Sequence, residues 1–122
     1  MKKDINYYLD RGCDAKAAAY FASGRRTIVS VTANADYTLT LTFDNGEIRL
    51  YDATKLFTTG SIFNKIKSPK DFQRVYLDSS NCVSWDIDPN VDSNKVWSNK
   101  LDLCPDSCYL DSVLISKAQS IA

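Results

Sequence analysis

Hydrophobic and polar residues alternate most regularly in the middle of the chain. In YTLTLTF, residues 37–43, every second residue is apolar and threonines stand between them. This period is typical of a strand with one face in a core and the other in water. DNG at 44–46 predicts a hairpin turn, because Asn-Gly tolerates positive φ. EIRLYD, residues 47–52, should return as the next strand with Ile48 and Leu50 facing inward.

The segments before this hairpin predict one more strand and two helices. TIVSVTA, residues 27–33, should pair with the hairpin and complete a three-stranded meander. Residues 3–10 have helical spacing, and a second helix should run from an N-cap at Asp14 to a stop at Gly24. We expect that helix to pack through small residues on one face: Ala15, Ala18, Ala19 and Ala22.

The second half of the chain predicts short helices and another pair of strands. Residues 54–66 have a broken helical pattern, and SPKDF at 68–72 predicts a turn of helix with Pro69 at its first position. RVYLD, residues 74–78, and CVSWD, residues 82–86, are expected to pair. The order predicts an α+β fold: a helical pair, a three-stranded antiparallel meander, short helices, a second strand pair and a C-terminal loop or short helix. We expect residues 1–122 to form a single domain.

The composition is typical of a globular protein. The net charge of the whole chain is zero, but the basic and acidic residues are distributed unevenly along it. Of the 122 residues 44% are hydrophobic and 25% charged, with a net charge of zero. Residues 1–83 hold twelve Lys and Arg against nine acids, whereas residues 84–112 hold six Asp against two Lys. Two interpretations stay open: the acidic segment folds over the basic body, or the body binds a nucleic acid or nucleotide. The basic residues available for such binding are Arg25, Arg26, Arg49, Lys65, Lys67, Lys70 and Arg74.

No segment predicts secretion or membrane insertion. The start MKKDINYYLD is followed by no apolar run of signal-peptide length, and no stretch approaches the roughly 18 apolar residues of a membrane span. We therefore expect a cytoplasmic protein that does not bind membranes and whose cysteines are reduced.

Three segments resemble the domain-of-unknown-function 2442 family of small bacterial proteins. They are VSVTANADYTLTLTFDNGEIRLYDATKLF, then IFNKIKSPKDFQRVYLD, then VWSNKLDLCPDSCY. The resemblance covers about residues 27–110, with residues 1–24 as an extra helical module and residues 79–95 as an acidic insert. It implies a small α+β domain. Relatives look like partners in toxin–antitoxin-type gene pairs or are fused to helix-turn-helix domains, which implies a binding or regulatory module without catalytic residues.

The acidic stretch WDIDPNVDSNK, residues 85–95, is one candidate for chemistry. Four of its residues occupy positions 1, 3, 5 and 7 of an EF-hand count: Asp86, Asp88, Asn90 and Asp92. Position 6 is Val91 instead of glycine, and position 12 is Trp97 instead of a bidentate glutamate. Asp and Asn also form turns by accepting backbone N–H groups. We therefore favour a structural role for these acidic residues, in which their side chains stabilise turns, over a calcium site.

Zinc binding and catalysis have less support in the sequence. Cys104 and Cys108 have C-x3-C spacing, and Cys82 and Cys13 could supply the other two thiolates of a four-cysteine site. However, the chain has no histidine, and Cys13 and Cys82 lack the close spacing of a second zinc-binding pair. Without histidine the usual general base is missing, and the single glutamate is Glu47. No glycine-rich phosphate-binding motif is present. We expect no enzyme and no cofactor; if a metal binds, its candidate ligands are Cys82, Cys104 and Cys108.

A partner-binding module is therefore the function that the sequence favours. Tryptophan beside charge is typical of an interface anchor, although both tryptophans could instead close the core. The predicted surface for a protein partner consists of Trp85, Asp86, Asp88, Asp92 and Trp97. A regulatory or antitoxin-like role follows from the resemblance. The alternatives are a nucleic-acid or nucleotide binder and a weak metal-binding domain.

Overall fold

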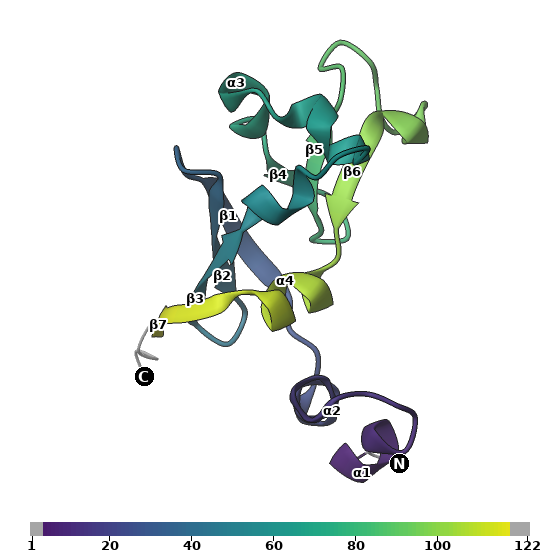
Figure 1. Ribbon diagram of the computed structural model, residues 1–122, viewed down its shortest axis with the longest axis vertical. Helices are drawn as coiled ribbons and strands as arrows, with labels where there is room; N and C mark the ends of the chain where they lie inside the picture. Colours follow the sequence, from purple (N-terminus) through teal and green to yellow (C-terminus); the bar gives the residue numbers. More distant parts are fainter. Residues whose placement is uncertain (1–3, 118–122) are drawn as a thin grey trace.

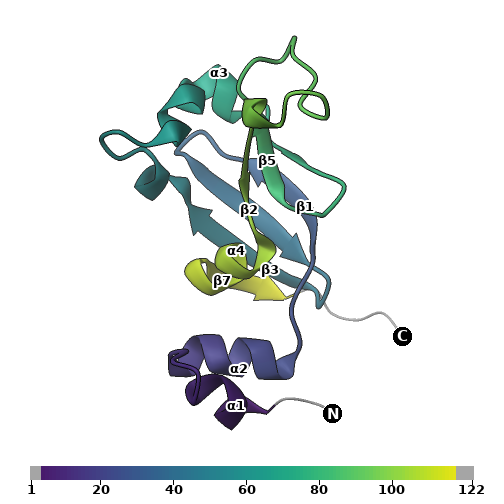
Figure 2. The ribbon, with the colours of Figure 1, turned by 90° about the vertical axis from the view of Figure 1, so that its right-hand side faces the viewer.

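Two antiparallel sheets with short helices around them make up the fold (Figures 1 and 2). The computed structural model describes residues 4–117. Within that part of the chain no helix is long and apolar enough to cross a membrane. The α-helices are α1 Ile5–Leu9, α2 Ala15–Ser23, α3 Pro69–Phe72 and α4 Pro105–Asp111, and the 3₁₀ helices are η1 Ala53–Leu56, η2 Ile62–Ile66 and η3 Trp97–Asn99. The strands are β1 Ile28–Ala33, β2 Thr38–Phe43, β3 Glu47–Asp52, β4 Tyr76–Leu77, β5 Val83–Asp86, β6 Lys100–Leu103 and β7 Val113–Lys117. The predicted α+β class is confirmed.

The first sheet has the order β1-β2-β3-β7. Its first three strands are the predicted meander, and the tight turn between β2 and β3 ends at Gly46, whose φ is +85°. In β2 the apolar residues are buried and the threonines half-buried, as their alternation predicts. Strand β7 was not predicted. It pairs antiparallel with β3 and makes the sheet four-stranded.

The inward face of β3 is the reverse of the prediction. The hairpin register sets Leu39 opposite Tyr51 and Leu41 opposite Arg49. Opposite residues of an antiparallel pair share a face. Tyr51 is therefore buried, and so is Glu47, whereas Ile48 and Leu50 are only half-buried on the other face. The length of the turn sets the register of this hairpin. The prediction for β3 used hydrophobicity alone and therefore assigned the wrong face to the core.

The second sheet has the order β4-β5-β6 and packs into the same core. The pairing of β4 with β5 was predicted, whereas β6 was not. Strand β5 is central, and Trp85 in it has no exposed surface. Residues 79–95, expected to be an insert, thus contain the middle strand of this sheet. The buried apolar residues of the shared core are Ile28, Leu39, Leu41, Phe43, Tyr51, Ala53, Ile66, Phe72, Val83, Trp85, Leu101 and Cys108.

Helices α1 and α2 lie together at one end of the molecule, below the sheets in Figures 1 and 2. Both predicted boundaries of α2 are confirmed: the Asp14 carboxylate accepts the N–H of Ala17, and Gly24 caps the C-terminus. The alanine face is only partly as expected. Ala18 is buried, whereas Ala15 and Ala19 are exposed.

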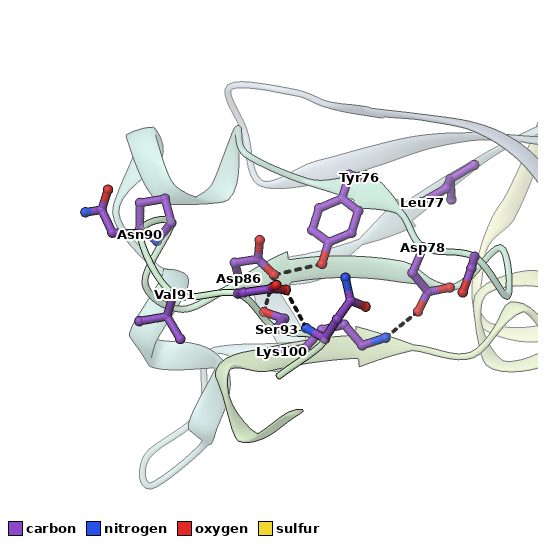
Figure 3. Close-up of a pocket in the computed structure, with 12 residues that line it drawn as sticks. Tyr76, Leu77, Asp78, Asp86, Asn90, Val91, Ser93 and Lys100 are labelled. Carbon is purple, nitrogen blue, oxygen red and sulfur yellow. Dashed lines mark hydrogen bonds and ion pairs between the residues drawn. The ribbon is translucent and has the colours of Figure 1, made fainter. Parts of the chain in front are cut away.

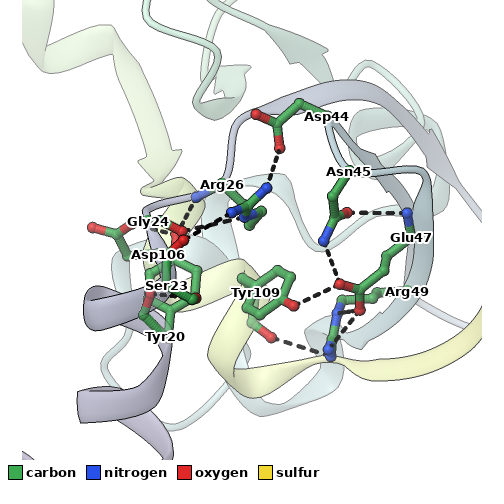
Figure 4. Close-up of polar contacts among 10 residues, drawn as sticks. All are labelled: Tyr20, Ser23, Gly24, Arg26, Asp44, Asn45, Glu47, Arg49, Asp106 and Tyr109. Carbon is green, nitrogen blue, oxygen red and sulfur yellow. Dashed lines mark hydrogen bonds and ion pairs between the residues drawn. The ribbon is translucent and has the colours of Figure 1, made fainter. Parts of the chain in front are cut away.

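Tyr20, instead of the alanines, fixes α2 to the domain. Its ring packs on Tyr109 of α4 with centroids 4.8 Å apart. Its hydroxyl donates to Asp106 at 2.6 Å and accepts the N–H of Arg26 at 2.9 Å. Burial and the hydrogen bond to Asp106 raise the Tyr20 pKa, so the phenol stays protonated. Figure 4 shows these contacts beside those of Glu47.

Glu47 joins α4 to the first sheet. Its carboxylate accepts the Tyr109 hydroxyl at 2.6 Å and pairs with Arg49 at 2.9 Å. The Arg49 guanidinium lies over the Tyr109 ring, 4.0 Å from its centroid. Burial opposes the charge on Glu47, but hydrogen bonds from Tyr109 and Asn45 and the charge of Arg49 outweigh it and lower its pKa. This polar network positions α4 between β3 and α2.

Candidate binding site

Trp97 stands on the surface directly after a polar loop. Residues 87–96, the acidic loop, connect β5 to η3, and Trp97 is the first residue of η3. It is 83% exposed, the largest value among the large apolar residues of 4–117, and the preceding Val96 is 47% exposed. The loop lies at the end of the molecule opposite to α1 and α2 (Figures 1 and 2).

Trp85 has the opposite environment. It is fully buried, its indole N–H donates to the carbonyl of Phe72 at 3.0 Å, and its ring stacks on Phe72. Trp85 therefore closes the core and is not available to a partner, which corrects the prediction that placed it on the binding surface. The buried faces of β5 required an apolar residue there, and the sequence alone did not separate this tryptophan from Trp97.

Asn99 holds the acidic loop in one conformation. Its buried side chain accepts the N–H of Asp88 at 2.9 Å. The amide nitrogen donates to the carbonyls of Asp88 and Val91 and to the hydroxyl of Ser93, all at 3.0–3.1 Å. Its carbonyl accepts the N–H of Ile87 at 2.7 Å. The sequence analysis missed Asn99, because its role arises from contacts with residues 87–93 that form only in the folded loop.

The acids of the loop act mainly as turn formers. Asp88 accepts the N–H of Asn90 at 2.9 Å, and Asp92 accepts the N–H of Asn94 at the same distance. Each contact closes a turn over two residues, as expected for Asx-turns. Asp88 and Asp92 nevertheless remain exposed, so their charge faces solvent.

A polar pocket of about 620 Å³ lies between the acidic loop and the second sheet (Figure 3). Asp86 in its wall accepts the hydroxyls of Tyr76 at 2.7 Å and Ser93 at 2.6 Å. Across the pocket, Lys100 pairs with Asp78 at 2.7 Å. Burial and the hydrogen bond to Asp86 raise the pKa of Tyr76 to about 12, so Tyr76 acts as a donor at neutral pH. The pocket can hold hydrogen-bonding groups, and its wall is net negative.

The seven basic residues proposed for nucleic-acid binding do not form one surface. Each of the four arginines has a partner within the chain: Arg25, Arg26, Arg49 and Arg74. Arg74, for example, donates to the carbonyl of Asp86 at 2.9 Å and supports the start of the acidic loop. Lys65, Lys67 and Lys70 are exposed along η2 and α3. Of these seven residues, the three lysines are exposed and have no ion pair with the described acids.

The cysteines proposed as zinc ligands are free thiols in different environments. Cys108 is buried, and burial raises its pKa to about 12. Cys104 is exposed and caps α4. Within residues 4–117 the group that could hold a metal is Asp78, Cys82 and Asp102. Burial and the charges of Asp78 and Asp102 raise the pKa of the Cys82 thiol, while Lys100 already neutralises Asp78.

A comparison with protein families gives a match over most of the chain. The profile described as "Protein of unknown function (DUF2442)" matches residues 28–110. The chain belongs to this family. A search of curated proteins and one of solved structures found no match. The family match includes β5, the acidic loop and Trp97, but excludes α1, α2 and β7.

Proposed function

We propose that this DUF2442 protein is a non-enzymatic module that binds a protein partner through Trp97 and the acidic loop. The exposure of Trp97 is the observation that carries the proposal. Burying an aromatic side chain removes some 150–250 Å² of surface from water, and tryptophan is enriched among the residues that dominate binding energy. An 83% exposed tryptophan contributes little to the fold of the free protein, whereas a partner that covers it gains that burial.

The hydrogen bonds of Asn99 support the same proposal. A flexible loop must be ordered on binding, and each immobilised side chain costs free energy. The acidic loop is already ordered by Asn99 and its two Asx-turns. Trp97, two residues before Asn99, is therefore presented from a rigid support.

Charge defines the kind of partner surface that fits. Asp88 and Asp92 are exposed on the loop, and Lys95 is the one basic residue between them and Trp97. Complementary potential speeds association and excludes wrong partners. We expect the partner to present an apolar pocket bordered by basic residues.

A regulatory or antitoxin-like role is the form of binding that the family resemblance favours. It rests on that resemblance alone. We infer further that the protein acts in the cytoplasm, since Cys13, Cys82, Cys104 and Cys108 are all free thiols. The non-enzymatic part of the proposal rests on the lack of histidine in the sequence and on the ion pair of the only glutamate with Arg49.

A nucleic-acid binder is the second candidate, and the three exposed lysines of η2 and α3 favour it. Binding to phosphate should weaken steeply with added salt because counterions are released. Replacing Lys65, Lys67 and Lys70 by Gln would abolish such binding without affecting a partner that contacts Trp97.

Capture from cells that make the protein tests the leading proposal. The full chain carries an affinity tag, and wild type is compared with Trp97→Ala and with Val29→Ala. Val29 is a matched control because it is 53% exposed and lies outside the acidic loop. We expect a protein that is retained by wild type and Val29→Ala and lost with Trp97→Ala. A partner retained equally by all three variants would place the binding surface elsewhere.

A further inference from the structure

Two cysteines face each other at the end of the β5–β6 pair. The last paired residues of the register are Val83 and Leu103, so the next position outward sets Cys82 opposite Cys104. The backbone of Cys104 is still extended. The hydrogen-bonded ladder ends here because the following residue, Pro105, has no N–H. The two cysteines therefore continue the strands by one pair.

The alternation of hydrogen bonds defines what kind of pair they form. The N–H of Ile87 donates to the carbonyl of Asn99, which marks a hydrogen-bonded position of the same ladder. Hydrogen-bonded and non-hydrogen-bonded pairs alternate, and Cys82 is five residues from Ile87, an odd number. Cys82 and Cys104 thus form a non-hydrogen-bonded pair, in which Cα atoms lie about 4.5 Å apart. Disulfides join Cα atoms about 4.4–6.8 Å apart.

The two thiols also share one face of the second sheet. The ligand atoms of Asp78, Cys82 and Asp102 lie within 4.8 Å of one another. Asp102 precedes Cys104 by two residues along an extended chain, so both side chains leave the same face. Burial, followed by the charges of Asp78, Asp102 and Cys104, raises the pKa of the Cys82 thiol. The sulfur of Cys104 is therefore near enough to act on that of Cys82.

We propose that Cys82 and Cys104 form a reversible disulfide when the protein meets a hydroperoxide. The exposed Cys104 attacks the O–O bond as a thiolate and becomes a sulfenic acid, while the other oxygen is protonated and leaves as water or an alcohol. The sulfur of Cys82 then attacks the sulfenic sulfur, the S–S bond forms and water leaves. The two thiols lose two electrons and two protons, and the peroxide takes them up. A dithiol reductant reverses the bond by exchange.

The other two cysteines lack this arrangement. Cys108 is buried in α4, and burial raises its pKa to about 12. Cys13 lies in the connection between α1 and α2. Neither continues a strand, so no register sets either of them opposite another cysteine. Cytosolic disulfides are mostly transient and redox-sensing, which agrees with thiols that are reduced until an oxidant arrives.

The disulfide closes residues 82–104 into a loop that contains the acidic loop and Trp97. Closing a loop restricts the unfolded chain and so favours the folded state. Oxidation should therefore stabilise the support from which Trp97 is presented. The bond forms without a partner, so its formation does not depend on the proposed function.

Peptide mapping of the full chain tests the proposal. Reduced protein is treated with hydrogen peroxide in slight molar excess, digested without reductant and analysed by mass spectrometry. We expect the peptide of Cys82 linked to that of Cys104, two of the four thiols left free, and full recovery of thiols with a dithiol reductant. Cys82→Ser and Cys104→Ser should lose the linked peptide, whereas Cys13→Ser, the matched control, should keep it.

A parallel reaction in urea separates a bond made by the fold from random oxidation. We expect this link to dominate in folded wild type and to lose its preference in the unfolded chain. The oxidised wild type should melt at least about 5 °C above the reduced protein, and Cys82→Ser should show no such rise. A dominant link between Cys104 and Cys108, or the same mixture of links in buffer and in urea, would overturn the proposal. So would an oxidised wild type that melts no higher than the reduced protein.

Discussion

At the scale of single residues, Asn99 determines whether the acidic loop keeps its shape. Replacing Asn99 by Ala leaves the N–H of Asp88 and the carbonyl of Val91 without their partner. We expect the free energy of unfolding to fall by about 1–3 kcal/mol, since unsatisfied buried polar groups cost this much. Urea denaturation measures the loss. Asn94→Ala is the control, because Asn94 is exposed and contributes only a backbone N–H; equal stability of the two variants would contradict the role given to Asn99.

Glu47 should make stability depend on acid pH. Its pKa is lowered from 4.5 in the folded protein. The folded state therefore binds this proton more weakly than the unfolded state, and the stabilisation is present above the unfolded value and lost as pH falls through the folded one. We expect the free energy of unfolding to decrease below about pH 4.5, with a smaller slope for Glu47→Gln. Identical slopes for both proteins between pH 5 and pH 3 would exclude this contribution.

At the same scale the sequence predicts some positions well and others poorly. Leu39, Leu41 and Phe43 could be assigned to the core from alternation alone. Glu47 and Tyr51 could not, because their burial depends on the register set by the turn and on partners such as Tyr109, 62 residues away. The difference between Trp85 and Trp97 likewise depends on tertiary packing.

At the scale of elements, the inner face of β2 should contribute more to the stability of the fold than the outer face of β3. Leu41 is fully buried, so Leu41→Ala should cost about 2–5 kcal/mol through a cavity in the core. Leu50 is half-buried on the opposite face, so Leu50→Ala should reduce the free energy of unfolding by less. Thermal and urea melts measure both. If Leu50→Ala is the more destabilising, the face assignment of the hairpin is wrong.

The N-terminal helices should be separable from the rest. The family match begins at residue 28, and α2 contacts the domain chiefly through Tyr20 and α4. Deleting residues 1–24 should leave a folded domain of lower stability. Tyr20→Phe, which keeps the ring and removes the hydroxyl, should cost about 0.5–1.5 kcal/mol. An unfolded deletion product, seen by circular dichroism, would show that these helices belong to the core.

The elements that the sequence missed share a physical cause. β6 alternates over only four residues and β7 does not alternate, and each pairs with the edge of an existing strand: β6 with β5 and β7 with β3. The meander and the capped helix α2 carry local signals, so they could be predicted. Elements that depend on a distant partner strand leave no such signal.

At the scale of the whole molecule, the acidic loop stands at the end opposite to α1 and α2 (Figures 1 and 2). Trp97 and the loop lie within the family match, whereas α1 and α2 lie outside it. Between these two ends lies one core shared by both sheets. A variant at Trp97 should therefore leave the contacts of α2 intact, since distant sites contribute independently.

The affinity of the captured partner for Trp97→Ala is the measurement that tests the central claim most directly. Titration of wild type, Trp97→Ala and Val29→Ala by isothermal calorimetry gives three dissociation constants under one condition. We predict that Trp97→Ala raises Kd at least about tenfold, as loss of a dominant aromatic contact does, and that Val29→Ala does not. Equal affinity of Trp97→Ala and wild type would contradict the assignment of this surface as the binding site.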